Sequence, residues 1–352
     1  TRCGDCCGGC NVGAKNTVAL TYLPDAVRNG AEIFAQVKVR TVVRDGEGWR
    51  VDFEPDHVKG EKAPPSVRAD VVVLAAGTLG STEILLRSRE QGLAVSDRLG
   101  QRFSANGDII AFGYGAKSPV NAIGVGHPAK TDLVVGAAVS GQIHIVDQED
   151  LSRSLTIQEG VLPSAIAPML PVLFIPNGRL LGAVQSLISG VYRGPFAGLQ
   201  TFFVVSHDSA SGRMSLKNDR LDLAWPNAAE EPVYRRVDEA LAALVTRSGG
   251  SYVKNPLSGT MMGNQPATAH PLGGCGVGED SVSGVVNHKS QVFASHGTTT
   301  EVHKGLYVID GAIMPRSLGC NPLLSITALA ERALMHMGRD FNIKIDADPL
   351  AA

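Results

Sequence analysis

The chain contains two kinds of hydrophobic pattern: continuous apolar runs, and runs in which apolar and polar residues alternate. The clearest continuous run is Val71–Ala76, which is typical of a strand buried on both faces of a parallel sheet. It stops at Gly77, and we expect a helix to begin near Ser81, with Ile84–Leu86 as its apolar stripe. A strand, a glycine and a helix in this order form the local architecture of a nucleotide-binding domain.

The last third of the chain returns to the same pattern. Gly305–Gly311 predicts a strand that ends in an acid and a glycine, and we expect it in one parallel sheet with Val71–Ala76. After a loop, Asn321 as the N-cap and Pro322 at the first helical position are the expected start of a helix. Apolar residues at helical spacing continue to Met337.

The middle of the chain, from about residue 103 to residue 265, has a different pattern. Short alternating runs at Gln142–Val146, Thr201–Ser206 and Arg213–Leu216 predict antiparallel strands. One good amphipathic helix is predicted at Val233–Ser248. This middle part therefore has the character of a separate, substrate-facing domain.

Two earlier runs, Ile33–Val43 and Trp49–Phe53, predict strands joined by a turn. Taken with the other elements, they predict an α/β (α+β) fold of two domains. A discontinuous Rossmann-like domain would comprise residues 1–102 and 266–345. The substrate-binding domain, with a mostly antiparallel sheet, would comprise residues 103–265.

Composition and charge narrow the class of protein. With 44% hydrophobic and 19% charged residues, the chain has the composition of a globular protein. Its formal net charge of −2 shows no excess of basic residues that would bind nucleic acid. The longest uncharged stretch, Gly160–Gly178, contains several prolines, which argues against a membrane-spanning helix. It predicts an apolar loop over a pocket, with a buried core segment as the alternative.

Four of the six cysteines crowd into the first ten residues, at Cys3, Cys6, Cys7 and Cys10. Paired C-x-x-C spacing can hold zinc or an iron–sulfur cluster. The alternative, small residues packed close to a cofactor, is favoured, so no metal is expected. The cysteines lack the even spread of a disulfide framework, which favours a reducing compartment. We expect a cytoplasmic or membrane-associated protein that makes transient contact with a membrane surface.

Two segments carry candidate chemistry. His270 lies among small residues, where its imidazole could sit against a planar cofactor and remove a proton from a hydroxyl. Asn321 could orient the same alcohol. The helix that begins there would direct the free N–H groups of its N-terminus toward one site, which would stabilise the negative charge of a reduced flavin. Asp310 could accept hydrogen bonds from a ribose or ribityl hydroxyl. The alternatives are a histidine satisfied within the core and an ordinary capped helix beside a solvent-facing acid.

Four blocks of the chain together resemble the glucose–methanol–choline (GMC) oxidoreductase family, and within it the cholesterol oxidase-like branch. Each block is modest by itself, but they span nearly the whole chain in the family's order. The blocks are Asn11–Thr17 with Tyr22 and Leu23, Ala75–Leu86, His270–Cys275, and Asp310–Ala312 with Asn321–Arg332.

The resemblance implies an FAD enzyme in which a six-stranded sheet roofs the pocket of a small apolar, sterol-like alcohol. It implies that His270 and Asn321 are the catalytic pair, which binds the alcohol while hydride passes to the flavin. Sterol oxidases of this type also use a glutamate to move a ring double bond, and Glu159 is the candidate here. The implied cofactor-binding residues are Asn11, Gly13, Val37, Ala76, Gly77, Asp310, Gly311, Ala312, Asn321 and Pro322.

One departure from the family matters. The family begins with a strand, a G-x-G-x-x-G loop and a helix on the FAD diphosphate, and no such unit occurs in this sequence. Gly113-Tyr114-Gly115 and Gly124-Val125-Gly126 lack both the third glycine and the following helix. We therefore expect a fragment that lacks the main anion site for FAD. The alternatives to a sterol-oxidising enzyme are a non-catalytic fragment that cannot hold FAD and a GMC enzyme for another alcohol, such as a sugar or choline.

Overall fold

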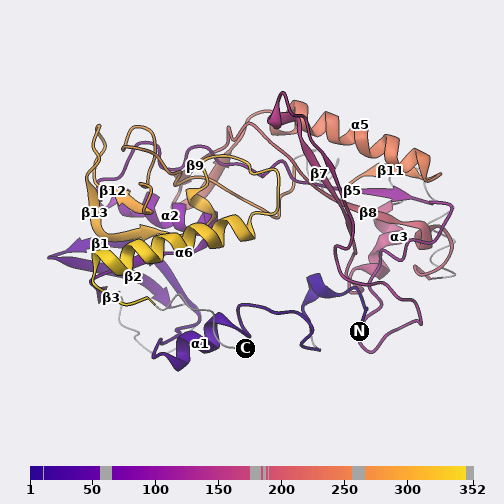
Figure 1. Ribbon diagram of the computed structural model, residues 1–352, viewed down its shortest axis with the longest axis horizontal. Helices are drawn as coiled ribbons and strands as arrows, with labels where there is room; N and C mark the ends of the chain where they lie inside the picture. Colours follow the sequence, from indigo (N-terminus) through magenta and orange to yellow (C-terminus); the bar gives the residue numbers. More distant parts are fainter. Residues whose placement is uncertain are drawn as a thin grey trace. The chain divides into compact units, whose positions relative to one another are not determined.

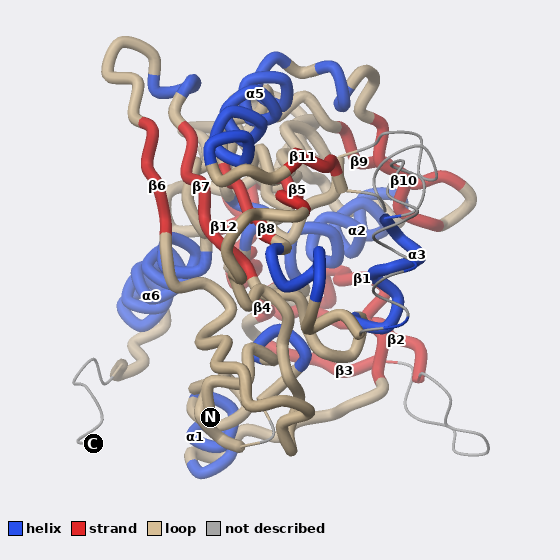
Figure 2. The backbone as a smooth tube through the Cα atoms, turned by 90° about the vertical axis from the view of Figure 1, so that its right-hand side faces the viewer, coloured by secondary structure: helices blue, strands red, loops and turns tan. Residues whose placement is uncertain are grey.

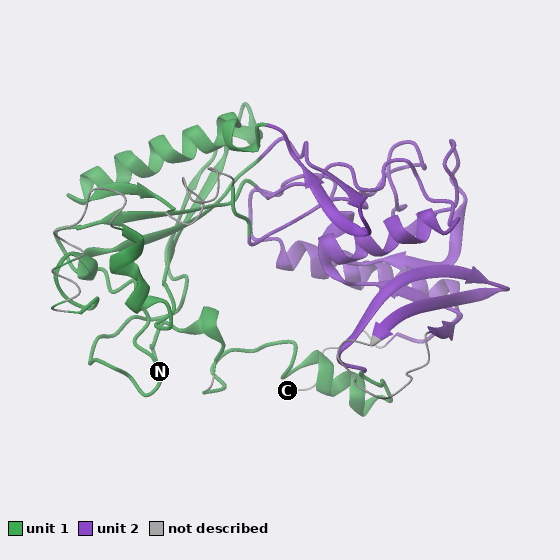
Figure 3. Cartoon of the chain, turned by 180° about the vertical axis from the view of Figure 1, so that it is seen from behind, with its two compact units in different colours: residues 1–33, 107–207, 227–268 green, residues 34–106, 208–226, 269–352 purple. Residues whose placement is uncertain are grey.

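The chain divides into two compact units (Figure 3). The computed structural model describes residues 1–10, 12–55, 66–174, 184, 188, 190–255 and 266–345. Unit 1 is formed by residues 1–33, 107–207 and 227–268, and unit 2 by residues 34–106, 208–226 and 269–352. Each unit is therefore assembled from three separate segments of the sequence.

The units differ from the predicted domains in two long segments and in two short ones, residues 103–106 and 266–268. Residues 1–33 group with the middle of the chain, and residues 208–226 group with unit 2 rather than with the predicted substrate-binding domain. The second difference has a clear physical cause. Strands β9 (Arg213–Lys217) and β10 (Arg220–Ala224) pair only with each other, and the buried Arg87 of unit 2 donates to Asp219 in their turn at 2.8 Å.

Unit 2 is built on a three-stranded sheet of β12 (Gln291–Phe293), β13 (Val302–Val308) and β4 (Val72–Leu74), in that order. Strands β13 and β4 are parallel, with Leu306 opposite Val72, which confirms that the two predicted strands share a sheet. Helix α2 (Gly77–Glu90) follows β4, and helix α6 (Leu323–Asp340) follows β13.

The two helices cover opposite faces of this sheet. Because side chains of a strand alternate between faces, Leu306 and Val308 point one way and Tyr307 and Ile309 the other. The first pair is buried in one core cluster with Ile84–Leu86 of α2. The second pair is buried in another cluster with Ala333 and Met337 of α6, the yellow helix of Figure 1. Helix, sheet and helix therefore form three layers, as expected of a nucleotide-binding domain.

The prediction of a long strand buried on both faces at residues 71–76 was wrong. Strand β4 has only three residues, and Val73 is 41% exposed. In the part of the chain that the structure describes, β4 is also the edge strand of its sheet, so it has a paired neighbour on one side only. Helix α2 also begins earlier than Ser81, because Gly77 adopts a left-handed φ of +76° that turns the chain directly from strand into helix.

A second sheet of unit 2 joins β1 (Val37–Asp45), β2 (Gly48–Pro55) and β3 (Ser66–Ala69) in antiparallel order. The two strands and the turn predicted for this region are confirmed, and β3 is an additional strand that the pattern did not reveal. Trp49 of β2 is almost fully buried, and its indole Nε1 donates to the backbone oxygen of Lys304 at 3.0 Å. This bond ties the second sheet to the start of β13.

Unit 1 contains a five-stranded antiparallel sheet in the order β11-β5-β8-β7-β6. Helix α5 (Pro232–Arg247) lies along this sheet (Figures 1 and 2), and its apolar face shares a core cluster with β5, β7 and β8. The predicted antiparallel sheet and helix are therefore confirmed. The strands are β5 (Ile109–Tyr114), β6 (Gln142–Ile145), β7 (Leu155–Gly160), β8 (Gln200–Val205) and β11 (Ser251–Lys254), and a short helix α1 (Tyr22–Arg28) precedes them.

The uncharged segment at residues 160–178 is described as far as residue 174. It forms a 3₁₀ turn at Ala167–Met169 and helix α3 (Leu170–Phe174) rather than an irregular loop. Phe174 is buried against Phe112 of β5, whereas Met169 and Val172 are exposed. The inner side of the segment is therefore core, as the alternative interpretation had it. Among the described residues, none of the helices has the length and apolar character needed to span a membrane.

Candidate active site

Three blocks that are distant in the sequence converge in unit 2. The backbone N–H of Gly273 donates to the oxygen of Gly311 at 3.1 Å, and that of Cys275 donates to Ala312 at 2.9 Å. The hydroxyl of Thr78, in the first turn of α2, donates to the oxygen of Pro271 at 2.6 Å. The segment that carries His270 is therefore bound to the ends of both parallel strands.

Asp310 joins the two strand ends. It is 7% exposed, its Oδ2 accepts a 2.5 Å hydrogen bond from Ser81, and its Oδ1 accepts a 2.8 Å bond from the N–H of Ala312. Ser81 in turn accepts from the N–H of Ala76 at 3.0 Å. Burial raises the pKa of Asp310, and the bonds from Ser81 and Ala312 offset part of the rise. Asp310 thus organises both turns, and its contact with a ribityl or ribose hydroxyl stays a prediction.

The glycines of these turns have two different roles. Gly77 leaves open space where a Cβ would stand, and Ala75, Ala76 and Gly77 are exposed at the carboxyl end of β4. By contrast, a Cβ on Gly311 would stand 2.9 Å from the Thr78 hydroxyl oxygen. The first glycine therefore exposes backbone at the end of the strand, and the second allows the close packing of the His270 segment.

The segment that follows His270 and the loop that precedes Asn321 are both anchored on residues 104–106. Ser104 and Leu272 exchange two backbone hydrogen bonds of 2.9 Å each, which fixes the chain two residues after His270. Ser104 and Ala105 are themselves held by Asp208, whose carboxylate accepts from the Ser104 hydroxyl at 2.7 Å and from the Ala105 N–H at 2.8 Å. None of these anchoring residues was predicted from the sequence.

Asn106 holds the loop that leads to Asn321. Its Oδ1 accepts from the N–H of Leu318, and its Nδ2 donates to the oxygen of Cys320, each at 2.9 Å. Since the anchors of the two catalytic segments are only two positions apart, the backbones next to His270 and Asn321 are brought together. That the two side chains bind one oxygen stays a prediction.

Helix α6 begins one residue later than expected. Leu323 is its first residue, Pro322 occupies the N-cap with φ −82°, and Asn321 lies outside. The prediction of Asn321 as the N-cap was wrong, because Pro322 has no N–H to satisfy and can take the cap position without a side-chain bond. Asn321 is exposed, and Leu323 and Leu324 are 76% and 79% exposed. The start of α6 is therefore an open and largely apolar surface.

The remaining predicted residues are distributed over both units. Val37 is half-buried at the start of β1 in unit 2, and Gly13 is exposed in unit 1 with a left-handed φ of +66°. Asn11 lies outside the described residues. Glu159 is exposed on β7 of unit 1, where its carboxylate accepts a hydrogen bond from the hydroxyl of Ser140. The roles given to these four residues stay predictions.

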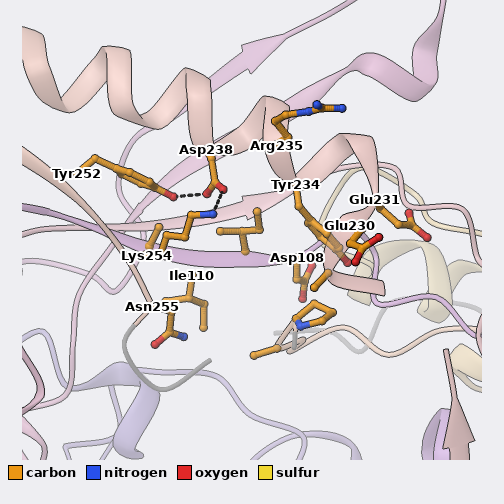
Figure 4. Close-up of a pocket in the computed structure, with 15 residues that line it drawn as sticks. Asp108, Ile110, Glu230, Glu231, Tyr234, Arg235, Asp238, Tyr252, Lys254 and Asn255 are labelled. Atoms are coloured by element: carbon orange, nitrogen blue, oxygen red, sulfur yellow. Dashed lines mark hydrogen bonds and ion pairs between the residues drawn. The ribbon is translucent and has the colours of Figure 1, made fainter. Parts of the chain in front are cut away.

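Unit 1 has a cavity of about 470 Å³ between α5 and strands β5 and β11. Figure 4 shows Asp238 beside Tyr252 and Lys254; it accepts from Tyr252 and pairs with Lys254, each at 2.5 Å. Thr268, two residues before His270, donates to the cavity residue Asp108 at 3.0 Å. This cavity is large enough for a small ligand, but none of the predicted site residues lines it. Sequence reasoning missed it because its groups come from three separate elements.

Comparison with known sequences connects these features to relatives. The chain is 29% identical to a cholesterol oxidase of Acinetobacter baumannii over 96% of this chain and 61% of that protein. It is 27% identical to a cholesterol oxidase of Mycobacterium tuberculosis, over 94% of this chain and 58% of the relative. A long-chain-alcohol oxidase of Arabidopsis thaliana is 22% identical over 93% of this chain and 44% of its own length. The chain thus spans about six-tenths of the first two relatives.

Solved structures share the fold. A pyridoxine 4-oxidase from Mesorbium loti matches with a TM-score of 0.54 at 19% identity, over 96% of this chain and 64% of that one. An FAD-dependent oxidoreductase from Chaetomium thermophilum matches with a TM-score of 0.55 at 16% identity, over 93% and 65%. Residues 1–105 match the amino-terminal domain of GMC oxidoreductases, and residues 210–330 match the carboxyl-terminal domain. The chain therefore belongs to the GMC oxidoreductase family, whose cofactor is FAD.

Proposed function

We propose that this chain acts in the FAD-dependent oxidation of an alcohol to a carbonyl compound. The observation that carries the proposal is the hydrogen-bonded convergence of the His270 segment, the Gly77 turn and the Asp310 turn at the carboxyl ends of two parallel strands. Ligands of open α/β sheets bind at that end. The family assignment supports the same chemistry.

The residues present fit part of an FAD site. The exposed turn at Ala75–Gly77 offers backbone at the start of α2, and helix N-termini favour anionic groups such as a diphosphate. Gly311 and Ala312 would lie along the same cofactor, positioned by Asp310, while Asn321 and Pro322 at the start of α6 would face its flavin end. When bound, FAD supplies the hydride acceptor.

Within this proposal, His270 takes the proton of the substrate hydroxyl, and Asn321 binds the oxygen and fixes its orientation. Both roles require two side chains held at one place, because a misplacement of about 1 Å can cost up to about 10²-fold in rate. The backbone anchors at Ser104 and Asn106 supply that rigidity. Histidine is the side chain that most often serves as general acid or base in enzymes.

The proposed substrate is a bulky apolar alcohol, with a sterol as the finer assignment. The names of the relatives, cholesterol oxidases and a long-chain-alcohol oxidase, support an apolar alcohol in general. For a sterol, Glu159 would move a ring double bond after oxidation. The exposed Met169 and Val172 would provide the transient contact with a membrane surface from which such a substrate is taken.

Two alternatives remain distinct from this proposal. A GMC enzyme for a sugar or choline would bind FAD but would not be reduced by apolar alcohols. A non-catalytic chain would not hold FAD at all.

The test is to purify the 352-residue chain with FAD, record the flavin absorbance, and add cholesterol, a long-chain alcohol, glucose or choline without oxygen. Bleaching of bound flavin by cholesterol supports the proposal, and Glu159→Gln should then keep oxidation but lose the double-bond shift. If only glucose or choline bleaches the bound flavin, the substrate is a polar alcohol and the proposed apolar alcohol is wrong. A colourless protein that folds cooperatively would overturn the proposal in favour of the non-catalytic chain.

A further inference from the structure

The hydroxyl of Thr78 reaches the backbone beside His270 from a distant part of the sequence. Thr78 lies in the first turn of α2 and donates to the oxygen of Pro271, 193 positions away, at 2.6 Å. Only 3% of Thr78 is exposed, so water has little access to replace this bond. The contact is therefore a product of the tertiary fold, one residue from the proposed proton acceptor.

The peptide group between Pro271 and Leu272 is held from both sides. Its oxygen accepts from Thr78, and its N–H donates to the oxygen of Ser104 at 2.9 Å. Because a peptide group is planar, two bonds to its opposite sides fix the orientation of the whole plane. The Leu272 side chain is fully buried and holds the same point of the chain. A fixed plane therefore follows directly after His270.

Little backbone freedom separates this plane from His270. The ring of Pro271 holds its φ at about −65°, so this torsion cannot absorb a tilt of the plane. The residue before a proline is itself restricted to extended conformations, which limits the backbone of His270. A tilt of the Pro271–Leu272 plane would therefore move His270 instead of being absorbed between them.

The surrounding residues leave room for this hydrogen bond. A Cβ on Gly311 would stand 2.9 Å from the hydroxyl oxygen of Thr78 and 3.3 Å from the oxygen of Pro271. Glycine at this position therefore lets both partners approach each other. Thr78 also follows Gly77, in the exposed turn where we place the cofactor. One side chain thus connects that turn to the segment of His270.

We propose that Thr78 is a positioning residue for His270, whose hydroxyl orients the Pro271–Leu272 peptide group and so places the imidazole for proton transfer. The inference rests on the proposed role of His270 as proton acceptor. Since a misplacement of about 1 Å can cost up to about 10²-fold in rate, loss of the hydroxyl should lower kcat by about 10–10²-fold. The change in KM should be smaller, because binding of the substrate does not require the exact position of the imidazole.

The experiment compares Thr78→Ala with Thr78→Ser in the full chain loaded with FAD. Serine keeps the hydroxyl and alanine removes it, so the difference between these variants isolates the hydrogen bond. Valine is unsuitable, because one of its methyl groups would stand where the hydroxyl now lies, 2.6 Å from the oxygen of Pro271. Per bound flavin, we expect Thr78→Ser to keep kcat within about threefold of the wild type, and Thr78→Ala to lose about 10–10²-fold.

Thr41→Ala is the matched control. Thr41 is 2% exposed, and its hydroxyl donates to Asp52 at 3.1 Å in the second sheet of unit 2. This variant loses a buried threonine hydroxyl away from His270 and should keep kcat. A cooperative urea transition like that of the wild type shows that each variant is folded.

Hydrogen exchange of the free chain is a second measurement, which needs neither FAD nor substrate. The N–H of Leu272 should exchange faster in Thr78→Ala than in Thr78→Ser or Thr41→Ala, because its peptide group is then held from one side only. If no alcohol reduces the flavin, the proposed function is wrong, whereas this exchange still decides whether Thr78 holds the segment.

Three results would overturn the proposal. Equal kcat in Thr78→Ala and Thr78→Ser would remove the role of the hydroxyl, and an equal loss in both would assign the effect to packing of the Thr78 methyl. Equal exchange of the Leu272 N–H in the two variants would show that the bond does not orient the peptide group. A loss of bound flavin with unchanged turnover per flavin would make Thr78 a cofactor-binding residue instead.

Discussion

Replacement of Asn106 tests whether the site depends on anchors that touch neither substrate nor cofactor. Asn106 is fully buried and has a left-handed φ of +55°. Its amide is the bridge between the N–H of Leu318 and the oxygen of Cys320. Asn106→Asp keeps the acceptor and tolerates the left-handed backbone, but it loses the donor and turns a carboxylate oxygen toward the Cys320 oxygen.

The expected cost follows from these two bonds. Loss of a partner for a buried polar group costs about 1–3 kcal/mol, and the full pair would be lost in Asn106→Ala. Asn106 is 0% exposed, so Asn106→Asp must bury a charge or take up a proton, and we expect the upper end of this range, about 3 kcal/mol. Asn106→Ala should cost about 2–4 kcal/mol, because it also loses both bonds and places alanine in the left-handed region.

The assay is urea unfolding of the free chain together with turnover in the FAD-loaded protein. Because the loop carries Asn321, we expect kcat to fall by about 10–10²-fold in Asn106→Asp, with a smaller change in KM. Asn121→Asp is a matched control, since Asn121 also has a left-handed φ (+57°) and donates a single 3.3 Å bond to the oxygen of Val134. Equal stability and kcat in both variants would show that Asn106 does not anchor the catalytic loop.

Three further changes probe the site directly. His270→Ala should reduce turnover by about 10²–10⁴-fold without loss of bound flavin, and near-normal turnover would remove His270 as the proton acceptor. Gly311→Ala should destabilise the fold by about 1–3 kcal/mol in urea, because its Cβ would press on Thr78; Gly297→Ala, where the nearest atom is 3.7 Å away, should cost far less. Burial raises the pKa of Asp310, so the folded state keeps a proton that the unfolded state releases, and stability falls as the pH rises above the ordinary value of 3.8. Asp310→Asn should remove this fall in stability, measured by urea unfolding at a series of pH values above 3.8. If the variant still loses stability as the pH rises, Asp310 is not the group responsible.

The elements of the fold were largely predictable, because hydrophobic spacing reports which side of an element is buried. Val233–Ser248 was expected as an amphipathic helix and is α5, Pro232–Arg247. The spacing does not report how many neighbours a strand has. The apolar run at residues 71–76 looks like a central strand, yet Val73 is 41% exposed on the edge strand β4. That information lies in the topology of the sheet and not in the run itself.

The candidate site was predictable only where it forms recognisable blocks. His270 and Asn321 were selected by their types and by the family resemblance, and their neighbouring backbones do lie on common anchors. Ser104, Asn106 and Asp208 gave no local signal, because serine, asparagine and aspartate are common in every loop. The partner that gives Asn106 its importance, Cys320, is 214 positions away.

These unpredicted anchors stand where the chain crosses between its units. Three of the five points at which the chain passes from one unit to the other follow Asn106, precede Asp208 and precede Ala269. Within unit 2, Ser104 bonds to Asp208 at 2.7 Å and to the backbone of Leu272 at 2.9 Å, so three segments of this unit are tied to one another near these points. Without these bonds, His270 would lie at the end of a free connection, and fixing it in place would cost conformational entropy. The bonds of Ser104 within unit 2 remove that freedom, so the position of His270 depends on Ser104 and Asp208 as well as on its own segment.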